Sequence, residues 1–174
     1  DHFGLPAEKV AVVYEAADQI FSFTYPNPER VWNKYGLIPG TYLYYPAHTW
    51  KHKNHKLILQ ALVILKESRQ MVLPIICTGT PKEAHAELLQ LSETLGIREQ
   101  FKFLGFCPQQ EIPAFYIGAS ALVFPSFFEG FGMPVLEAMQ CHCPVICSKT
   151  TGLMEVAGEA AFLIDPGDPE ALAE

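Results

Sequence analysis

Short, uninterrupted apolar runs alternate with longer segments of helical periodicity through most of this 174-residue chain, and this alternation is the feature that most constrains its fold. Apolar runs without polar alternation are typical of strands that are buried on both faces of a sheet. Strands that alternate with helices need crossover connections, which are right-handed and build a parallel sheet. The expected strands occupy residues 42–46, 73–77, 101–104, 121–124, 144–147 and 161–164.

Helix start and stop signals lie between these runs. Asn27-Pro28 predicts a short helix that Gly36 ends, and Asn54 is placed to cap the next helix. The segment 80–83 predicts a capping box at the start of a helix that ends near Gly96. Shorter helices are expected at residues 109–117, 134–140 and 153–157.

Six strands in this pattern suit an α/β fold with a doubly wound, Rossmann-like parallel sheet in the order 3-2-1-4-5-6. In that order strands one and four lie side by side, and ligands bind in the crevice between the loops that leave them. Those loops are residues 46–53 and 125–133. We therefore expect a ligand-binding domain at residues 41–174, with residues 1–40 forming a linker segment packed on it.

Composition excludes several classes of protein. Hydrophobic residues make up 49% and charged residues 18% of the chain, which indicates a globular domain and not a disordered segment. A net charge of −7 argues against nucleic acid as a partner. The five cysteines lie mostly in apolar runs, so we expect reduced thiols and a cytoplasmic protein. Because the chain begins at Asp1 and stops inside a helix-like run, we expect a piece of a longer protein.

The loop and helix after the fourth strand have the features of an anion site. Gly130 and Gly132 allow positive φ and a close approach of the backbone to a ligand. Pro134 begins a helix, and free N–H groups from Val135 onward are expected to face an anion at the positive end of the helix dipole. Each feature alone is common in structural turns, but their combination at the predicted crevice favours a ligand site.

Two carboxylates flank this turn. Glu137 lies on the first helical turn, about 4.5 Å along the helix axis from Pro134, where it can accept two hydrogen bonds from a vicinal diol such as a ribose. Glu129 precedes the turn and can reach the other end of the same ligand. This arrangement favours a nucleotide sugar, which carries a ribose, a diphosphate and a second sugar.

The loop after the first strand contributes cations. Residues 48–56 contain three lysines and three histidines, and we expect Lys53 to be the main contact to a diphosphate, although a solvated basic helix start would have the same composition. His48, His52 and His55 could hold a metal at helical spacing, but zinc sites usually have a clearer ligand set, so no metal is expected.

Other candidate chemistry is weaker. The segment 141–143 has the sequence Cys-His-Cys but lacks the second ligand pair of a zinc site. Ser126 lacks the Gly-x-Ser-x-Gly context of a serine hydrolase. Residues 78–83 are too short and lack the Lys-Ser/Thr pair of a phosphate-binding P-loop.

The sequence Glu129-Gly-Phe-Gly-Met-Pro-Val-Leu-Glu137 resembles the E-x7-E motif of the retaining glycosyltransferases of family 4, the group 1 glycosyl transferases. Further matching segments follow in family order along nearly the whole chain, at residues 45–55, 103–106, 124–126, 143–148, 152–156 and 165–172. The resemblance implies a GT-B enzyme, in which two Rossmann-like domains enclose the active site. This chain resembles the C-terminal, donor-binding domain, so the N-terminal acceptor domain of the same protein is expected to be its partner.

The resemblance also implies roles for individual residues. Glu137 would bind the ribose hydroxyls, Lys53 the diphosphate, and Glu129 the hydroxyls of the transferred sugar. Backbone N–H groups that would contact the sugar and phosphates are those of Phe131, Gly132 and Val135. The nucleobase would lie near Gly105, Phe106 and Cys107, and neither a metal nor another cofactor is expected.

The chain departs from the family pattern at a few positions. Many members have Arg where His48 stands, and His is mostly neutral at pH 7 with an ordinary pKa of about 6.5, so Lys51 could substitute as the second cation. His142 and Gln140 replace the usual Gly and Ala behind the site. Thr151 and Met154 replace a common Gly and Pro, which alters the sugar contacts expected of that loop.

The implied reaction is transfer of a hexosyl group from a nucleotide-diphosphate sugar to a hydroxyl of a saccharide or lipid-linked saccharide, with retention at the anomeric carbon. The isolated fragment is expected to be inactive, because its acceptor half is missing. Two alternatives remain, a nucleotide-binding module without turnover and a GT-B epimerase or phosphorylase. The expected location is the cytoplasm. The missing domain could attach the protein to the inner face of a membrane.

Overall fold

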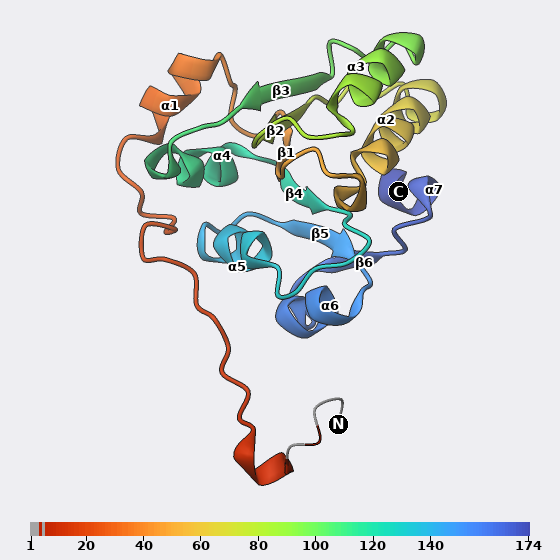
Figure 1. The fold of residues 1–174 in the computed structure, drawn as a ribbon. Coiled ribbons are helices and arrows are strands. Elements are labelled where there is room, and N and C mark those ends of the chain that lie inside the picture. The colour runs from red at the N-terminus through yellow and green to blue at the C-terminus, as the bar shows by residue number, and fades with distance from the viewer. Residues whose placement is uncertain (1–3, 5) are drawn as a thin grey trace.

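The sheet is the predicted one. The computed structural model describes residue 4 and residues 6–174, and the strands in this part of the chain pair in the order β3-β2-β1-β4-β5-β6, all in parallel (Figure 1). The strands are β1 Leu43–Pro46, β2 Ile75–Thr78, β3 Phe101–Gly105, β4 Ala121–Phe124, β5 Val145–Ser148 and β6 Phe162–Ile164. The doubly wound α/β architecture is therefore confirmed, and β1 and β4 are neighbours as expected.

Helices cover both faces of the sheet. The α-helices are α1 Pro28–Tyr35, α2 His55–Arg69, α3 His85–Thr94, α4 Ile112–Gly118, α5 Met133–Gln140, α6 Thr151–Ala157 and α7 Pro169–Ala173, and 3-10 turns lie at Ala7–Lys9, Lys51–Lys53 and Gln109–Glu111. One layer contains α2 packed against α3 and α7, and the other contains α1, α4, α5 and α6 packed in sequence (Figure 1). No helix in the described residues is both long and apolar enough to cross a membrane.

The central strands are buried on both faces, as their uninterrupted apolar sequences predict. Every residue of β2 and β4 is buried, and Tyr44 and Tyr45 of β1 are completely shielded from solvent. The tyrosine hydroxyls remain satisfied, because that of Tyr44 shares a hydrogen bond of 2.8 Å with Thr78 on the next strand. Hydrogen-bonded hydroxyl groups therefore lie inside the core beside the crevice, at the ends of these strands.

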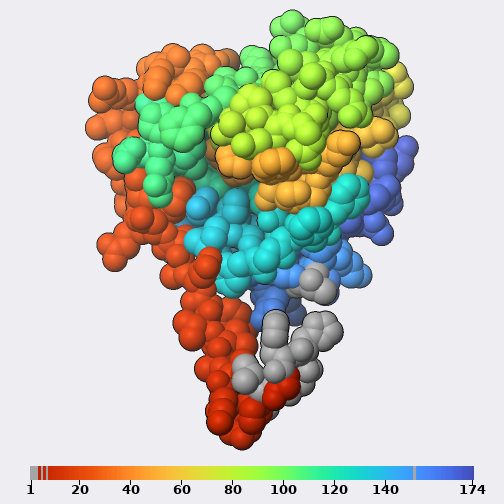
Figure 2. Space-filling view, in the orientation of Figure 1, coloured from red at the N-terminus to blue at the C-terminus, as the bar shows by residue number. Residues whose placement is uncertain are grey.

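The N-terminal segment runs away from the body of the domain before α1 (Figures 1 and 2). Its apolar residues include Val12 and Val13, which are exposed and belong to no strand. Further along, α1 packs on α4, and Trp32 Nε1 donates to the carbonyl of Ala114 at 2.7 Å. Of the predicted linker at residues 1–40, residues 1–3 and 5 lie outside the described part.

The predicted capping box at residues 80–83 is wrong, because α3 begins only at His85. The segment is held instead against the loop after β1. Lys82 donates its backbone N–H to Thr49 Oγ1 at 2.6 Å, and Glu83 accepts from the backbone N–H of Lys51 at 3.1 Å. Tertiary hydrogen bonds have thus replaced the local ones that the sequence suggested.

Asn54 occupies the predicted position before α2, but its side chain does not cap that helix. Its amide Nδ2 donates to the carbonyl of Pro125 at 3.0 Å and to that of Pro166 at 2.8 Å. The residue adopts a left-handed backbone conformation with φ of 57°, which Asn tolerates well, and it is 7% exposed. Asn54 therefore joins three loops at one edge of the sheet.

His142 stands where the resembled family usually has Gly, and the backbone explains that preference. Its φ is 56°, a left-handed conformation that glycine adopts without cost. The imidazole stacks on Phe23 with ring centroids 4.3 Å apart and planes 14° apart. This contact joins the turn after α5 to the N-terminal segment.

Asn54→Gly should lower the free energy of unfolding by about 1–2 kcal/mol, since two buried hydrogen bonds are lost at about 1 kcal/mol each and relief of the left-handed backbone offsets part of that loss. Urea denaturation measures this loss. Gln70→Gly is the matched control, because Gln70 is also left-handed, with φ of 54°, but exposed, and its replacement should leave stability unchanged or slightly raised. Equal effects of the two substitutions would contradict the bridging role of Asn54.

Candidate functional site

The loops after β1 and β4 are joined along their length. The backbone N–H of Phe127 donates to the carbonyl of His52 at 2.9 Å, next to the bond from Asn54 to Pro125. Tyr45 OH donates to the carbonyl of Lys53 and lies 3.3 Å from Ser126 Oγ. In the space-filling view the orange segment after β1 lies directly against the cyan segment after β4 (Figure 2). The convergence of these two loops, predicted from strand order, is thus observed.

Lys53 and Glu129 meet at this junction. Lys53 Nζ lies 2.6 Å from Glu129 Oε1, and the two side chains are only 18% and 13% exposed. The ammonium also lies 5.4 Å from the ring centroid of Phe124, at the end of β4. The two residues assigned to opposite parts of a ligand are therefore partners of each other in the free chain.

Glu137 lies deeper, on α5. Its Oε2 accepts a hydrogen bond of 2.7 Å from the hydroxyl of Tyr116, a completely buried residue of α4. Burial raises the pKa of Glu137, and the bond from Tyr116 opposes that rise. The carboxylate lies close enough to Tyr44 that, after burial, it contributes to the raised pKa of that phenol. The ring of Tyr116 packs edge-on against Tyr44, which in turn bonds Thr78 at the end of β2.

The turn before α5 has the predicted shape in part. Gly132 has φ of 98°, but Gly130 has no positive φ, so only Gly132 needs glycine for its backbone conformation. The N–H of Val135 is also not free as expected, because it donates to the carbonyl of Gly132 at 2.9 Å and the residue is fully buried. The N–H groups of Phe131, Gly132 and Met133 donate to no described residue, so the available donors lie before Val135, and two of them, Phe131 and Gly132, are those that the resemblance implied.

A cavity of about 200 Å³ lies between the loops after β1, β2 and β3, and we call it the crevice cavity. Its lining residues are Pro46, Ala47, His48, Lys53, Thr78, Gly79, Phe106, Cys107 and Ile112. Gly79 permits the close approach of these loops, since a Cβ there would stand 2.7 Å from the backbone of Ala47. The predicted diphosphate contact Lys53 and the predicted nucleobase contact Phe106 thus line one space.

His48 is fixed as a neutral donor on this cavity. Its Nδ1 accepts the backbone N–H of Thr80 at 2.7 Å, so the proton of the neutral ring lies on Nε2. Burial lowers the pKa of His48, and the charges of Lys82 and Lys53 lower it further. Protonation would also place an Nδ1–H donor opposite the N–H donor of Thr80, and the hydrogen bond between them would be lost. His48 therefore supplies a hydrogen-bond donor and no positive charge near pH 7.

Gly105 is the last residue of β3, and Phe106, which follows it, lines the crevice cavity. Gly105 has φ of 78°, and Phe106 is 80% exposed although it is a large apolar residue. An exposed aromatic face beside a cavity is suited to stacking on a planar ring. The sequence-based assignment of a nucleobase to residues 105–107 fits this geometry.

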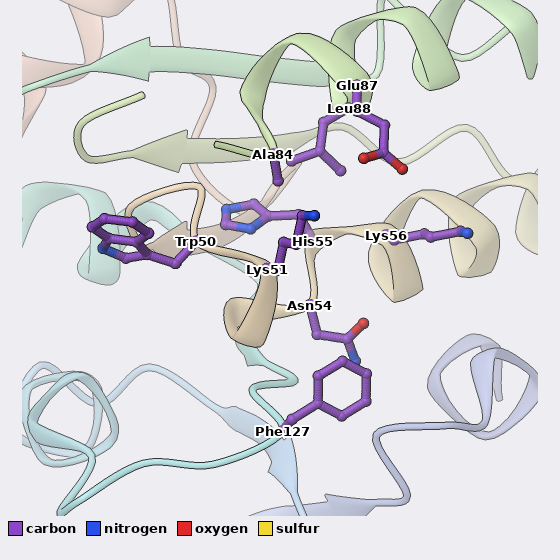
Figure 3. Close-up of a pocket in the computed structure, with 9 residues that line it drawn as sticks. All are labelled: Trp50, Lys51, Asn54, His55, Lys56, Ala84, Glu87, Leu88 and Phe127. Carbon is purple, nitrogen blue, oxygen red and sulfur yellow. The ribbon is translucent and has the colours of Figure 1, made fainter. Parts of the chain in front are cut away.

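Lys51 does not line the crevice cavity. It lines a second cavity of about 300 Å³ between the starts of α2 and α3, together with Trp50, Asn54, His55, Lys56, Ala84, Glu87, Leu88 and Phe127 (Figure 3). Glu129 and Glu137 line neither of the two cavities, whereas Lys53 lines the crevice cavity alone. The substitution of Lys51 for the missing family Arg therefore has no support from its position.

The three histidines of the loop do not converge. His48 bonds Thr80, His52 stacks on Phe128 with ring centroids 4.6 Å apart, and His55 packs on Tyr45 in the core. Burial lowers the pKa of His55 to about 3, which keeps it neutral. Among the described residues no three His, Cys, Asp or Glu side chains come together as a metal site.

Sequence reasoning missed Tyr116 and Lys82. Tyr116 lies in an apolar helix and has the pattern of a core residue, so nothing local linked it to Glu137. Lys82 was read as part of a capping box, but its ammonium lies 5.1 Å from the ring centroid of Trp50 and affects the pKa of His48. A basic residue directly after β2, the neighbour of β1, was the available signal.

Comparison with known proteins identifies the family to which the chain belongs. A family model described as "Glycosyl transferases group 1" matches residues 39–174. The O-antigen chain mannosyltransferase B of Escherichia coli is 40% identical over 144 residues, which cover 82% of this chain and 38% of that protein. The chain therefore spans less than half the length of this relative.

Solved structures with the same fold include two informative neighbours. The C-terminal domain of the group 1 family protein LpcC from Francisella tularensis superposes with a TM-score of 0.72 and 28% identity, over 91% of this chain and 84% of that domain. The Anabaena protein HepE, solved with UDP and glucose, has a TM-score of 0.82 and 25% identity, over 98% of this chain and 47% of that protein. The chain therefore corresponds to a C-terminal domain in LpcC and to about half of the HepE chain.

Gly132→Ala should lower the free energy of unfolding by about 1–3 kcal/mol, because a Cβ at this left-handed position would stand 2.4 Å from Cδ2 of the buried Leu153. Gly130→Ala is the control two residues away, with open space around its Cβ, and should change stability by less than about 0.5 kcal/mol. Urea denaturation compares the two. Similar losses for both would mean that the turn is not built as described.

Proposed function

The chain belongs to the group 1 glycosyl transferases, and we propose that it is the donor-binding domain of an enzyme that transfers a hexosyl group, specifically mannosyl, from a nucleotide diphosphate to a saccharide hydroxyl with retention. The observation that carries this proposal is the contact of Lys53, which lines the crevice cavity, with Glu129, whose loop leads directly to the free N–H groups before α5. Cations and backbone N–H groups stabilise a diphosphate, while carboxylates accept from sugar hydroxyls.

The ligand would lie along the ends of β3, β1 and β4. The nucleobase would stack near Phe106, the diphosphate would lie between Lys53 and the N–H groups of Gly132 and Met133, and the ribose would meet Glu137. The complex of HepE with UDP and glucose supports this choice of ligand, because that neighbour holds a nucleotide and a sugar together. No metal or other cofactor is part of the proposal.

The names of relatives support mannose as the transferred sugar. The relative that is 40% identical is an O-antigen chain mannosyltransferase, and the O-antigen chain mannosyltransferase RfbU of Salmonella typhimurium is 27% identical over 97% of this chain. The acceptor proposed on this basis is a growing polysaccharide chain. It would bind mainly to a second domain, at a cytoplasmic site that the second domain could place at a membrane.

The reaction would break the bond between the anomeric carbon and the diphosphate oxygen, and the leaving diphosphate would keep the electron pair. The acceptor oxygen would form the new bond on the same face of the sugar, and its proton would pass to the leaving phosphate. Lys53 and the start of α5 would stabilise the negative charge that develops on the diphosphate, because preorganised donors act strongly at a site shielded from water. Glu129 would orient the sugar.

The ion pair in the free chain has a role in this scheme. A diphosphate that reaches the crevice cavity competes with Glu129 for Lys53, and Glu129 is then released to accept from the hydroxyls of the sugar. The exchange keeps both groups paired before and after binding, which avoids leaving a partly buried charge alone. A diphosphate without a sugar satisfies Lys53 but leaves Glu129 without a new partner.

Ligand-observed NMR of this chain should show binding of GDP-mannose or another nucleotide-diphosphate mannose, and weaker binding of the same nucleotide diphosphate without its sugar. A panel of GDP-, UDP- and ADP-sugars identifies the base. Failure of every nucleotide to bind would contradict the proposal. Binding of nucleotides with no preference for an attached sugar would favour a nucleotide-binding module without turnover.

Lys53→Ala should weaken the binding of a nucleoside diphosphate by about 2 kcal/mol, roughly thirtyfold, because a charge-assisted contact is lost, and should change nucleoside binding little. Isothermal titration calorimetry with both ligands measures the difference, and circular dichroism checks the fold. Lys51→Ala is the matched control and should be nearly neutral, since its side chain lines the second cavity. Equal losses for nucleoside and diphosphate would remove Lys53 from the phosphate site.

A further inference from the structure

We propose that Tyr116 is a positioning residue for ribose recognition, because its hydroxyl holds one oxygen of Glu137 and leaves the other oxygen to accept from the ribose diol. This inference rests on the proposed function and adds a residue that does not itself touch the ligand. The hydrogen bond from Tyr116 OH to Glu137 Oε2 is 2.7 Å long. It is the one hydrogen bond that the described residues make to this carboxylate.

Tyr116 can act this way because its ring is fixed. The residue is completely buried. It packs edge-on against Tyr44 with centroids 5.0 Å apart at 84°, and against Phe21 with centroids 6.0 Å apart at 74°. A phenol held from two sides presents its hydroxyl at one place. The side-chain torsions of Glu137, which would otherwise be free to rotate, are thereby restricted.

A single donor to one carboxylate oxygen has a chemical consequence. The two hydroxyls of a ribose can both donate to the remaining oxygen, and a carboxylate oxygen accepts more than one hydrogen bond. The bond from Tyr116 also favours the ionised carboxylate, which is the form that accepts from both hydroxyls. Without it, burial alone would act on Glu137, and the protonated form would extend to higher pH.

The other titratable groups that face Glu137 do not titrate near neutral pH. Tyr116 on α4 and Tyr44 on β1 have a pKa raised well above the ordinary value, in both cases mainly by burial. Cys141, at the end of α5, has its pKa raised to about 12, again mainly by burial. Of the groups named here, Glu137 is therefore the one that changes charge at the lowest pH.

Tyr116→Phe removes only the hydroxyl and provides the test. The affinities of UDP and 2′-deoxy-UDP, and of GDP and 2′-deoxy-GDP, are measured by calorimetry between pH 5 and pH 8. Both members of a pair carry the same diphosphate and base, so their affinity ratio isolates ribose recognition from titration of the phosphate. The wild type should prefer the ribonucleotide about tenfold at pH 7. In Tyr116→Phe the preference should fall to about threefold or less, and its loss on acidification should begin at higher pH.

Two further variants serve as controls, one for the loss of a buried hydroxyl and one for the ionisation of Glu137. Tyr42→Phe removes another buried tyrosine hydroxyl, which donates to the carbonyl of Phe115 at 3.0 Å, and should leave the preference unchanged. Glu137→Gln keeps a side-chain oxygen to which Tyr116 can donate, but the new side chain cannot ionise. Its preference for the ribonucleotide should therefore be smaller than that of the wild type and independent of pH. Both variants are compared after thermal melts confirm that they fold.

The outcomes separate the two claims. If the wild type binds neither nucleotide diphosphate, the proposed function fails and the role of Tyr116 fails with it. If the wild type binds and shows the ribose preference, but Tyr116→Phe has the same preference and the same pH profile, then Tyr116 does not position Glu137 and the proposed function stands. A loss of preference that Tyr42→Phe shares would assign the effect to packing and also overturn the role of Tyr116.

Discussion

The site depends on the hydrogen bonds that join the loops after β1 and β4. Asn54 binds the carbonyls of Pro125 and Pro166, and the backbone of Phe127 binds that of His52. Parallel pairing of β1 with β4 brings the two loops to one edge, and these bonds, together with the one between Tyr45 and Ser126, set their separation. Lys53 immediately precedes Asn54, so the residue that locks the loops also sets where the ammonium lies. The contact between Lys53 and Glu129 follows from this arrangement.

Three side chains that a nucleotide sugar would need each have one partner inside the protein already. Lys53 is paired with Glu129, one oxygen of Glu137 is held by Tyr116, and Nδ1 of His48 is held by the backbone of Thr80. The remaining atoms, such as the Nε2–H of His48 and the free oxygen of Glu137, are left in defined directions. Such preorganisation lowers the ordering cost of binding. His48, although neutral, still provides a directed donor at its position.

The sequence predicted the fold well and the site in part. Continuous apolar runs located the six strands, and crossover rules gave their order, because both depend on local pattern and on chain handedness. The pairing of Tyr116 with Glu137 could not be predicted, because a tyrosine in an apolar helix has the same pattern whether or not it bonds a carboxylate. The start of α3 and the side chain of Asn54 were misread for a related reason, since tertiary partners displaced the local caps. The N–H of Val135 was expected to be free, although the tight turn at Gly132 uses it.

A crystal structure of this chain with a nucleotide-diphosphate sugar tests the central claim most directly. The account predicts the diphosphate within hydrogen-bond distance of Lys53 Nζ and of the N–H groups before α5, with the Lys53–Glu129 pair opened and the ribose on Glu137. A nucleotide bound in the second cavity, between Trp50 and Phe127 (Figure 3), would contradict it. So would a diphosphate bound in the crevice cavity away from an intact Lys53–Glu129 pair.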